Sequence, residues 1–509
     1  MISIDTERDP NVLRQVALLQ NQEITRLLAR NHELAVEIAR LRGEDPATLQ
    51  SEIDRLREMV AQQNQALFGR SSEKRPGEDA AGPSAADAPT PEARRKGHGP
   101  VPQATLPVVV ARVELAEDER SCPACGGVLV PMGAQCEESE EITVVERQFV
   151  KRVYTRQKYR CACNGCVVTA PAPEKLIPGG RYSIDFAVEV AVAKYLDHLP
   201  LERQVRMMAR EGLEVTSQAL WDQLWAAAGH LRPSYEAIRA GIVREAVLHA
   251  DETHCAILDR RGNEEMNRRW WVWNLTSAGA TYYEIHPSRS ASAARSLVGD
   301  WRGVAMVDGY GAYEALARGA PGITLAHCWA HVRRKFIDIE SSFPEESKAM
   351  VSLIAELYAV EREVASEEFA SDAARLARLG ALRASRSRAT LRAILEWMGQ
   401  QRVLPQSGLG RACRYVKELW EGLTRFAGDP RIPLDNNAAE RALRGVVVGR
   451  KNHYGSKSRR GTEVAALFYT LMETAKLQGV EPKAYLREAL RAAIRVPGTA
   501  TLPGKLTPA

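Results

Sequence analysis

Apolar residues recur with two different periods along the 509-residue chain. Near the N-terminus the steps alternate between three and four residues, as in Ile24, Leu27, Asn31, Leu34, Ile38 and Leu41. This spacing predicts a coiled-coil seam, in which the polar Asn31 fixes register and the number of partners. We interpret residues 1–70 as a helical, leucine-zipper-like region. An intramolecular helical hairpin broken at Asp45-Pro46 is the alternative.

The periodicity stops over residues 71–105, which are rich in Pro, Ala, Gly and charge and contain no aromatic residue. This composition predicts a disordered linker. Helical periodicity returns over residues 181–245. There, a turn at Gly212 separates a helix from a second one that Thr216 or Ser217 would cap. The outline is that of a helix-turn-helix, which serves either as a DNA reader or as a scaffold.

Alternation with a period of two dominates residues 246–340. The runs "AVLHADETHCAIL", "RWWVWNLTS" and "ATYYEIHP" predict three successive strands joined by polar turns. A short helix, the strand "GVAMVDGYGAY", the strand "GITLAHCWAH" and the helix "VRRKFIDI" follow. Antiparallel strands followed by strands that alternate with helices are the order of a ribonuclease-H-like fold.

These patterns predict a multidomain α+β protein. Its ribonuclease-H-like α/β core, with a mixed sheet, is expected over residues 246–460, and a helical insertion at about 341–430 would interrupt it. Residues 461–509 are expected to form C-terminal helices and a tail, with a joint at Gly479–Pro482.

Composition changes this picture only slightly. The net charge is +5, so any affinity for nucleic acid must come from local patches. No apolar run reaches transmembrane length, and the N-terminus lacks the pattern of a signal peptide. We therefore expect a cytoplasmic protein that does not bind membranes, in which the cysteines are thiols or metal ligands.

Cysteine spacing predicts a zinc-binding module over residues 106–180. Cys122 and Cys125 lie in "SCPACGG", strand-like residues follow at 141–160, and "CACNGC" supplies Cys161, Cys163 and Cys166. Two pairs of thiolates suit a structural zinc ion. Spacing favours Cys163 with Cys166, with Cys161 as a substitute, and unliganded cysteines are the other interpretation. The remaining cysteines are expected to be core thiols: Cys136, Cys255, Cys328 and Cys413.

Two acids stand in apolar strands. Asp251 lies inside the first predicted strand and Asp308 ends a later one. Buried like charges on neighbouring strands need a cation between them. A third carboxylate from a packed helix would complete a two-metal site of the kind that performs phosphodiester displacement. Glu252 alternates to the other face of its strand, which makes it the weaker ligand.

The stretch "LDNNAAERALRGVVVGRKNHYGSKSRRG" (434–461) begins with one acid, Asp435, and holds a single glutamate, Glu440, in a strongly basic strip. Asp435, Asn436 and Asn437 are helix-start residues, and Glu440 follows in the first turns. Glu440 is therefore the candidate third carboxylate, and a surface pair with Arg444 is the alternative. The basic excess indicates a nucleic-acid partner. The candidate DNA-binding residues are His331, Arg333, Arg334, Asn436, Asn437, Arg441, Arg444, Arg450 and Lys451.

Histidines near the strand "GITLAHCWAH" offer a second chemistry. His331 is a candidate to orient the scissile phosphate or to donate a proton, and a packing role for His327 and His331 is the alternative. A zinc site from His327, Cys328 and His331 lacks a fourth ligand.

Several segments occur in a characteristic order: "LFGRSSEK", "CPACGG", "KYLDHLPLERQVRMMAREG", "ADETH", "MVDGYGAY", "CWAHVRRKF", "LDNNAAERALR", "GRKN" and "TAKLQGVEPKAYL". In this the chain resembles a DDE-type transposase of the insertion-sequence-66 family, with an N-terminal coiled coil and a zinc-finger module. The resemblance implies a catalytic triad of Asp251, Asp308 and Glu440. The chain departs from the family pattern at two points. "CACNGC" has a third cysteine, and His254 stands where a proline is more usual.

The resemblance also implies chemistry and partners. Two Mg²⁺ or Mn²⁺ ions would support cleavage at the ends of an insertion sequence and strand transfer into target DNA. The protein would bind two kinds of DNA, the terminal inverted repeats of its element and the target. It would act as a homodimer or higher oligomer in a bacterial cytoplasm, at the nucleoid during the reaction. Accessory proteins of the same mobile element would assist. Two rival functions are a nuclease of the same fold and a zinc-dependent DNA-binding regulator without catalysis.

Overall fold

The computed structural model describes residues 115–116, 119–120, 122–130, 148–160, 166–257, 269–453, 455–456, 458–504 and 506, with Arg26, Arg30 and Leu34. The chain divides into two compact units, and Arg70–Gln148 forms the smaller one. The predicted coiled-coil seam, apart from Leu34, and the linker lie outside the described residues. So do Cys136, Cys161 and Cys163.

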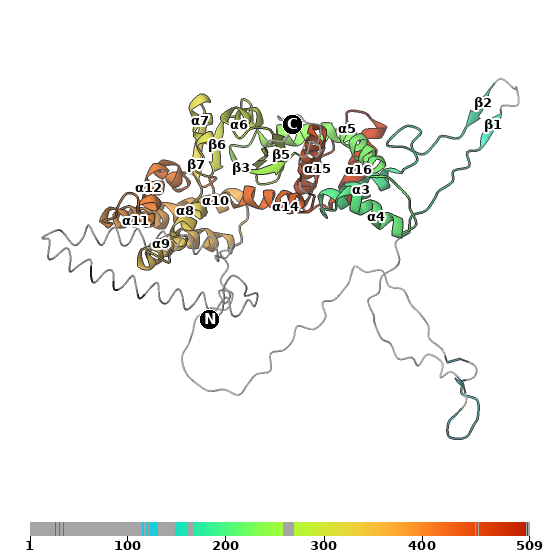
Figure 1. The fold of residues 1–509 in the computed structure, drawn as a ribbon, viewed down its shortest axis with the longest axis horizontal. Coiled ribbons are helices and arrows are strands. Elements are labelled where there is room, and N and C mark those ends of the chain that lie inside the picture. The colour runs from blue at the N-terminus through green and yellow to red at the C-terminus, as the bar shows by residue number, and fades with distance from the viewer. Residues whose placement is uncertain are drawn as a thin grey trace. The chain divides into compact units, whose positions relative to one another are not determined.

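A five-stranded mixed sheet forms the centre of the larger unit, in the order β5-β4-β3-β6-β7 (Figure 1). The first three strands of this sheet, β3, β4 and β5, pair antiparallel, and β6 and β7 lie parallel to β3. The bounds are β3 (Val247–Ala256), β4 (Arg269–Thr276), β5 (Thr281–His286), β6 (Gly303–Val307) and β7 (Ile323–His327). The expected mixed sheet and its succession of strands are thus confirmed.

Two helices make the parallel connections: α6 (Ala291–Val298) joins β5 to β6, and α7 (Gly311–Gly319) joins β6 to β7. Alternation along β3 explains how the sheet is packed. Leu248, Ala250 and Glu252 are buried on one face, while His249 and Asp251 on the other face are half-buried. Period-two alternation therefore separates the two neighbouring acids of this strand onto opposite faces.

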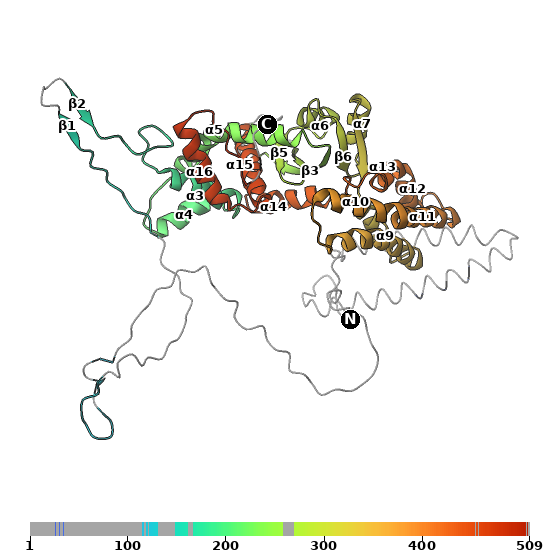
Figure 2. The ribbon, with the colours of Figure 1, turned by 180° about the vertical axis from the view of Figure 1, so that it is seen from behind.

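Helices that precede and follow the sheet strands in the chain share one core with the sheet. They are α3 (Ile184–Tyr195), α4 (Leu201–Arg210), α5 (Ser217–Ile242), α15 (Arg459–Leu477) and α16 (Pro482–Arg495). Thr216 caps α5 by accepting the Ala219 N–H at 3.2 Å, and Gly212 makes the preceding turn with φ of 79°. α15 lies along β5, where the Thr474 hydroxyl bonds the backbone of Thr281 (Figure 2).

A second core lies among the helices that follow β7. These are α8 (Trp329–Ile337), α9 (Pro344–Ala365), α10 (Asp372–Leu382), η3 (Arg383–Ser387), α11 (Arg388–Gln400), α12 (Gly408–Glu418), α13 (Trp420–Thr424) and η4 (Arg425–Ala427). Leu357, Ile394 and Val416 are fully buried there.

The buried Arg383 holds the chain that returns from these helices to the sheet. It pairs with Glu361 at 2.8 Å and donates to the carbonyls of Phe426 and Ile432. The returning segment leads into α14 (Asn437–His453), which packs against β3 and β4. None of the described helices is long and apolar enough to cross a membrane.

Candidate active site

Asp251 and Asp308 lie at the same level of two neighbouring parallel strands, Asp251 within β3 and Asp308 directly after β6. His249 on β3 pairs with Met306 on β6. Both acids come two residues later, so the register brings Asp251 beside Asp308, on strands about 4.8 Å apart. Backbone groups orient both carboxylates: Oδ1 of Asp251 accepts the Glu252 N–H at 2.8 Å, and Oδ1 of Asp308 accepts the Tyr310 N–H at 3.0 Å.

Asn436 fixes the start of α14 against β3. Its side chain is fully buried. The amide Nδ2 donates to the Ala250 carbonyl at 2.9 Å, and Oδ1 lies 3.0 Å from His249 Nδ1. The backbone N–H of Asn436 donates to Cys328 Sγ at 3.2 Å, and its carbonyl accepts the Glu440 N–H. Glu440 is therefore presented from the first turn of α14, over the face of β3 that carries Asp251.

The pKa of Asp251 responds to burial and to the charges of the neighbouring acids. Burial is the main cause that raises the pKa of Asp251 to about 7. The charges of Glu252, Asp308 and Glu440 raise this pKa further. Carboxylates gathered in this way repel one another when ionised, and carboxylate oxygens are the ligands that Mg²⁺ and Mn²⁺ prefer. The donor set thus fits a site for hard divalent cations.

Glu252, the neighbour of Asp251, belongs to the opposite face of the sheet. Its carboxylate pairs with Arg289 at 2.6 Å and accepts a short hydrogen bond from the Tyr313 hydroxyl. The Arg289 guanidinium lies 3.6 Å from the ring centroid of Tyr310 and 4.7 Å from that of Trp271. Neither Arg289 nor Tyr313 was predicted from the sequence, because each meets Glu252 only through tertiary packing.

The candidate DNA-binding residues fall into two groups. Arg441, Arg444 and Lys451 are exposed on α14, at spacings that place them along one face. Asn437, half-buried, donates to Asp435 at 2.7 Å, and Arg333 and Arg334 extend from α8. Two other candidates, Asn436 and Arg450, contact β3. Asn436 is wholly covered, and Arg450 donates to Thr253 Oγ1 at 2.8 Å and to the His254 carbonyl. Both of these contacts tie α14 to β3.

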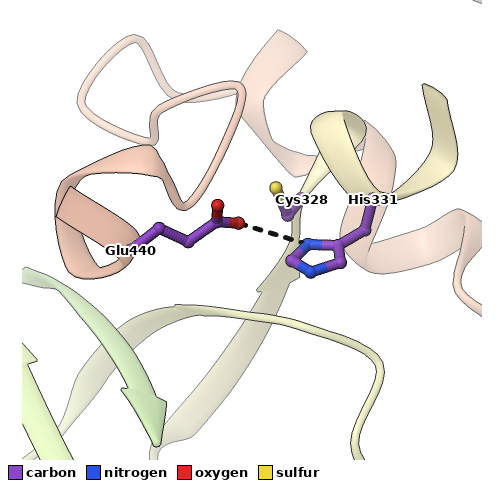
Figure 3. A group of neighbouring side chains, drawn as sticks. All are labelled: Cys328, His331 and Glu440. Atoms are coloured by element: carbon purple, nitrogen blue, oxygen red, sulfur yellow. Dashed lines mark ion pairs between the residues drawn. The ribbon is translucent and has the colours of Figure 1, made fainter. Parts of the chain in front are cut away.

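Glu440 faces His331, with 3.8 Å between Oε1 and Nδ1, and forms no ion pair with Arg444 in the described part of the chain. One ligand atom from each of Cys328, His331 and Glu440 lies within 4.8 Å of the others (Figure 3). The set that the sequence suggested, with His327, is not the set that the fold brings together. His327 is buried on β7, and its ring packs against Gly422.

Buried thiols are found where they were expected. Cys255, Cys328 and Cys413 are buried free cysteines. Burial raises the pKa of the Cys255 and Cys328 thiols to about 12. Such thiols are protonated at neutral pH unless a cation compensates the thiolate.

In the smaller unit, Cys122 and Cys125 lie on a tight turn. The Gly126 N–H donates to the Cys122 carbonyl at 2.8 Å, the Cys122 N–H donates to the Gly127 carbonyl at 2.7 Å, and Gly126 has φ of 72°. Backbone hydrogen bonds from Ala124 and Cys125 lower the pKa of Cys122. This turn suits thiolate ligands.

Cys166 is the described member of the second cysteine cluster, and it lies beside a two-stranded hairpin of the larger unit. β1 (Lys158–Arg160) pairs antiparallel with β2 (Val167–Thr169), and Cys166 precedes β2. Of the strand-like stretch 141–160, only Lys158–Arg160 is a strand among its described residues 148–160. Since Cys161 and Cys163 lie outside the described residues, the zinc-ligand set stays a prediction.

Comparison with known proteins places the chain in a family. A model described as "Transposase IS66 family" matches residues 179–464. The uncharacterized protein y4jD of Sinorhizobium fredii is 32% identical over 394 residues, which cover 74% of this chain and 75% of the relative. The uncharacterized protein y4hP of the same organism is 30% identical, with 74% and 70% covered. From the match and these relatives, the chain belongs to the IS66 family of transposases.

Proposed function

We propose that this protein is a DNA transposase in which Asp251, Asp308 and Glu440 hold two divalent cations, Mg²⁺ or Mn²⁺. It cleaves DNA at the ends of its insertion sequence and joins those ends to target DNA. Membership of the transposase family supports the reaction class. One observation carries the residue assignment. The two strand acids lie in parallel register, and the charge of Glu440 contributes to the raised pKa of Asp251.

The sheet supports the same proposal. Its order, three antiparallel strands and then two parallel strands joined through helices, is the order of a ribonuclease-H-like core. After the helical segment that follows β7, α14 returns to pack against β3 and β4, and this helix carries Glu440. We propose that residues 246–460 form this core and that residues 341–430 are an insertion within it.

The chain's own contribution is the positioning of three carboxylates on rigid elements. Backbone N–H groups hold Asp251 and Asp308, and the buried Asn436 locks the helix that presents Glu440. When bound, the cations would activate the attacking oxygen and stabilise the leaving one during phosphodiester displacement. Asn436 is thus a positioning residue in this proposal, and it replaces the DNA contact that its sequence neighbourhood suggested.

Exposed cations on α14 supply the DNA contact. Arg441, Arg444 and Lys451 continue along the helix from Glu440, so a phosphate backbone that reaches Glu440 can also reach them. Arg333 and Arg334 approach from α8, whose His331 faces Glu440. Such contacts position the duplex without reading its sequence.

The remaining parts of the proposal concern the N-terminal segments. Cys122 and Cys125, with Cys163 and Cys166 or with Cys161 as a substitute, would hold a structural zinc ion. Residues 1–70 would form the coiled coil of a homodimer or larger assembly. Terminal repeats of the element, target DNA and accessory proteins of the element are the partners proposed.

The test uses labelled DNA that carries the element's own ends, with Mg²⁺ or Mn²⁺. Asp251→Asn and Asp308→Asn should each lower cleavage by several orders of magnitude while DNA binding is retained. Asp300→Asn removes an exposed carboxylate near the start of β6 and serves as the charge-matched control, which should cut normally. Normal cleavage by Asp251→Asn would refute the site.

The products separate the rival functions. A joined product with target DNA supports a transposase, whereas cleavage that never leads to joining would indicate a nuclease. Metal-independent binding without cleavage by the wild type, in the presence of the element's accessory proteins, would indicate a regulator.

A further inference from the structure

Two buried polar atoms face each other in the site without a hydrogen-bond partner. They are Nδ1 of His331 and Oε1 of Glu440, 3.8 Å apart (Figure 3). This distance is too long for a hydrogen bond. A buried polar group without a partner is costly, and an ion between two such groups is one way to satisfy both.

Cys328 completes the group from the same helix. It is the N-cap residue of α8, and His331 follows three positions later, so both side chains lie at one helix end. The Cys328 sulfur accepts N–H groups from Asn436, His331 and Ala330. Backbone donors at a helix N-terminus stabilise a thiolate, which is the form of cysteine that binds metals.

The dimensions and chemistry of the group fit zinc. In a tetrahedral zinc site, sulfur, nitrogen and oxygen ligands lie about 3.3–3.6 Å from one another. The observed 3.8 Å between His331 Nδ1 and Glu440 Oε1 is about 0.5 Å longer than the nitrogen–oxygen end of this range, and all three ligand atoms lie within 4.8 Å of one another. A set of thiolate, imidazole and carboxylate selects zinc over magnesium, which takes oxygen ligands.

We propose that Cys328, His331 and Glu440 form a zinc site, separate from the cysteine module, that leaves the fourth coordination position open. Three protein ligands and an open position are the arrangement of an exchangeable or catalytic zinc site. Because Glu440 is shared, zinc withdraws this carboxylate from the cation site of Asp251 and Asp308. Zinc therefore inhibits the transposase. This consequence rests on the proposed function, whereas zinc binding does not.

Cobalt(II) is the spectroscopic probe for zinc in the full-length, metal-depleted chain. Sulfur–cobalt charge-transfer absorption reports thiolate ligands, and the number of cobalt equivalents bound is measured in parallel. Cys328→Ser should bind one equivalent fewer than the wild type. Cys413→Ser removes another buried thiol, and should match the wild type because Cys413 belongs to no ligand cluster among the described residues.

His331→Ala and Glu440→Gln provide independent tests in case Cys328→Ser fails to fold. Each should weaken cobalt binding at this site by about tenfold or more. An unchanged stoichiometry and spectrum in a folded Cys328→Ser variant would overturn the zinc site. So would an unweakened cobalt affinity in both other variants.

Inhibition is measured separately, by adding zinc to Mg²⁺-dependent cleavage. The zinc concentration for half-inhibition should be about tenfold or more higher for Cys328→Ser than for the wild type, each relative to its own uninhibited rate. Zinc that binds at Cys328 without inhibition would refute the sharing of Glu440. Loss of the cobalt site in Cys328→Ser, together with a wild type that never cleaves, would support the zinc site and contradict the proposed function.

Discussion

Replacing Asp251 with Asn should stabilise the folded protein at neutral and alkaline pH in the absence of divalent cations. Asp251 is a carboxylate whose pKa rises from 3.8 to about 7 on folding. The folded state therefore resists ionisation of this group. Asn removes the charge and keeps an oxygen that can accept the Glu252 N–H.

The size of the effect follows from the pKa. A shift of about 3 units corresponds to about 4 kcal/mol at most, since each unit is about 1.4 kcal/mol. Because the folded pKa is the higher one, wild-type stability from this group is intact below about pH 4. It is lost progressively as pH rises toward 7. The gain for Asp251→Asn should thus be small at pH 4, grow up to about pH 7, and level off above it.

The assay is denaturant unfolding followed by tryptophan fluorescence across this pH range, since β4 carries three tryptophans and pairs with the strand of Asp251. Adding Mn²⁺ should raise the stability of the wild type and change the variant much less. Asp300→Asn should show no pH-dependent gain. A variant no more stable than the wild type at any pH would refute the reasoning.

Three further predictions test the surroundings of the site. Asn436→Ala removes side-chain bonds to Ala250 and His249, so unfolding free energy should fall by about 2–3 kcal/mol. The cleavage rate at saturating DNA should fall as well. An unchanged unfolding free energy together with an unchanged cleavage rate would contradict the positioning role of Asn436. Arg289→Ala leaves Glu252 as an unpaired buried charge and should cost about 3–5 kcal/mol in denaturant unfolding; a loss below 1 kcal/mol would contradict this. Simultaneous Ala substitution of Arg441, Arg444 and Lys451 should weaken DNA binding. It should also reduce the slope of log binding constant against log salt concentration by up to about 3. If the salt dependence measured in a binding titration were unchanged, DNA would not bind at this face of α14.

Local patterns predicted the elements well because each has a strong local cause. Alternation marked β3 as a strand and separated Asp251 from Glu252. Apolar residues followed by an acid and a glycine marked the end of β6 at Asp308. Of the two candidate caps of α5, Thr216 and Ser217, Thr216 is the one that caps the helix. In each case residues adjacent in sequence supply the interaction, so spacing alone is informative.

Tertiary contacts were not predicted from the sequence because they join residues that are far apart along the chain. Asn436 looked like part of a DNA-binding strip, yet it meets Ala250 across 186 positions and is buried. Glu440 takes the place expected for His327 beside Cys328 because the chain returns to the sheet after a long helical segment. No periodicity within α8 or α14 records which of their residues will face each other.

The most direct test of the central claim is strand joining with ends that are already cut. DNA with a free 3′-hydroxyl at the element end is incubated with target DNA, Mn²⁺ and either wild-type protein or Glu440→Gln, and joined product is quantified beside DNA binding. We predict metal-dependent joining by the wild type, with loss of joining but not of binding in Glu440→Gln. Equal joining by both proteins would contradict the assignment of Glu440 to the site of Asp251 and Asp308.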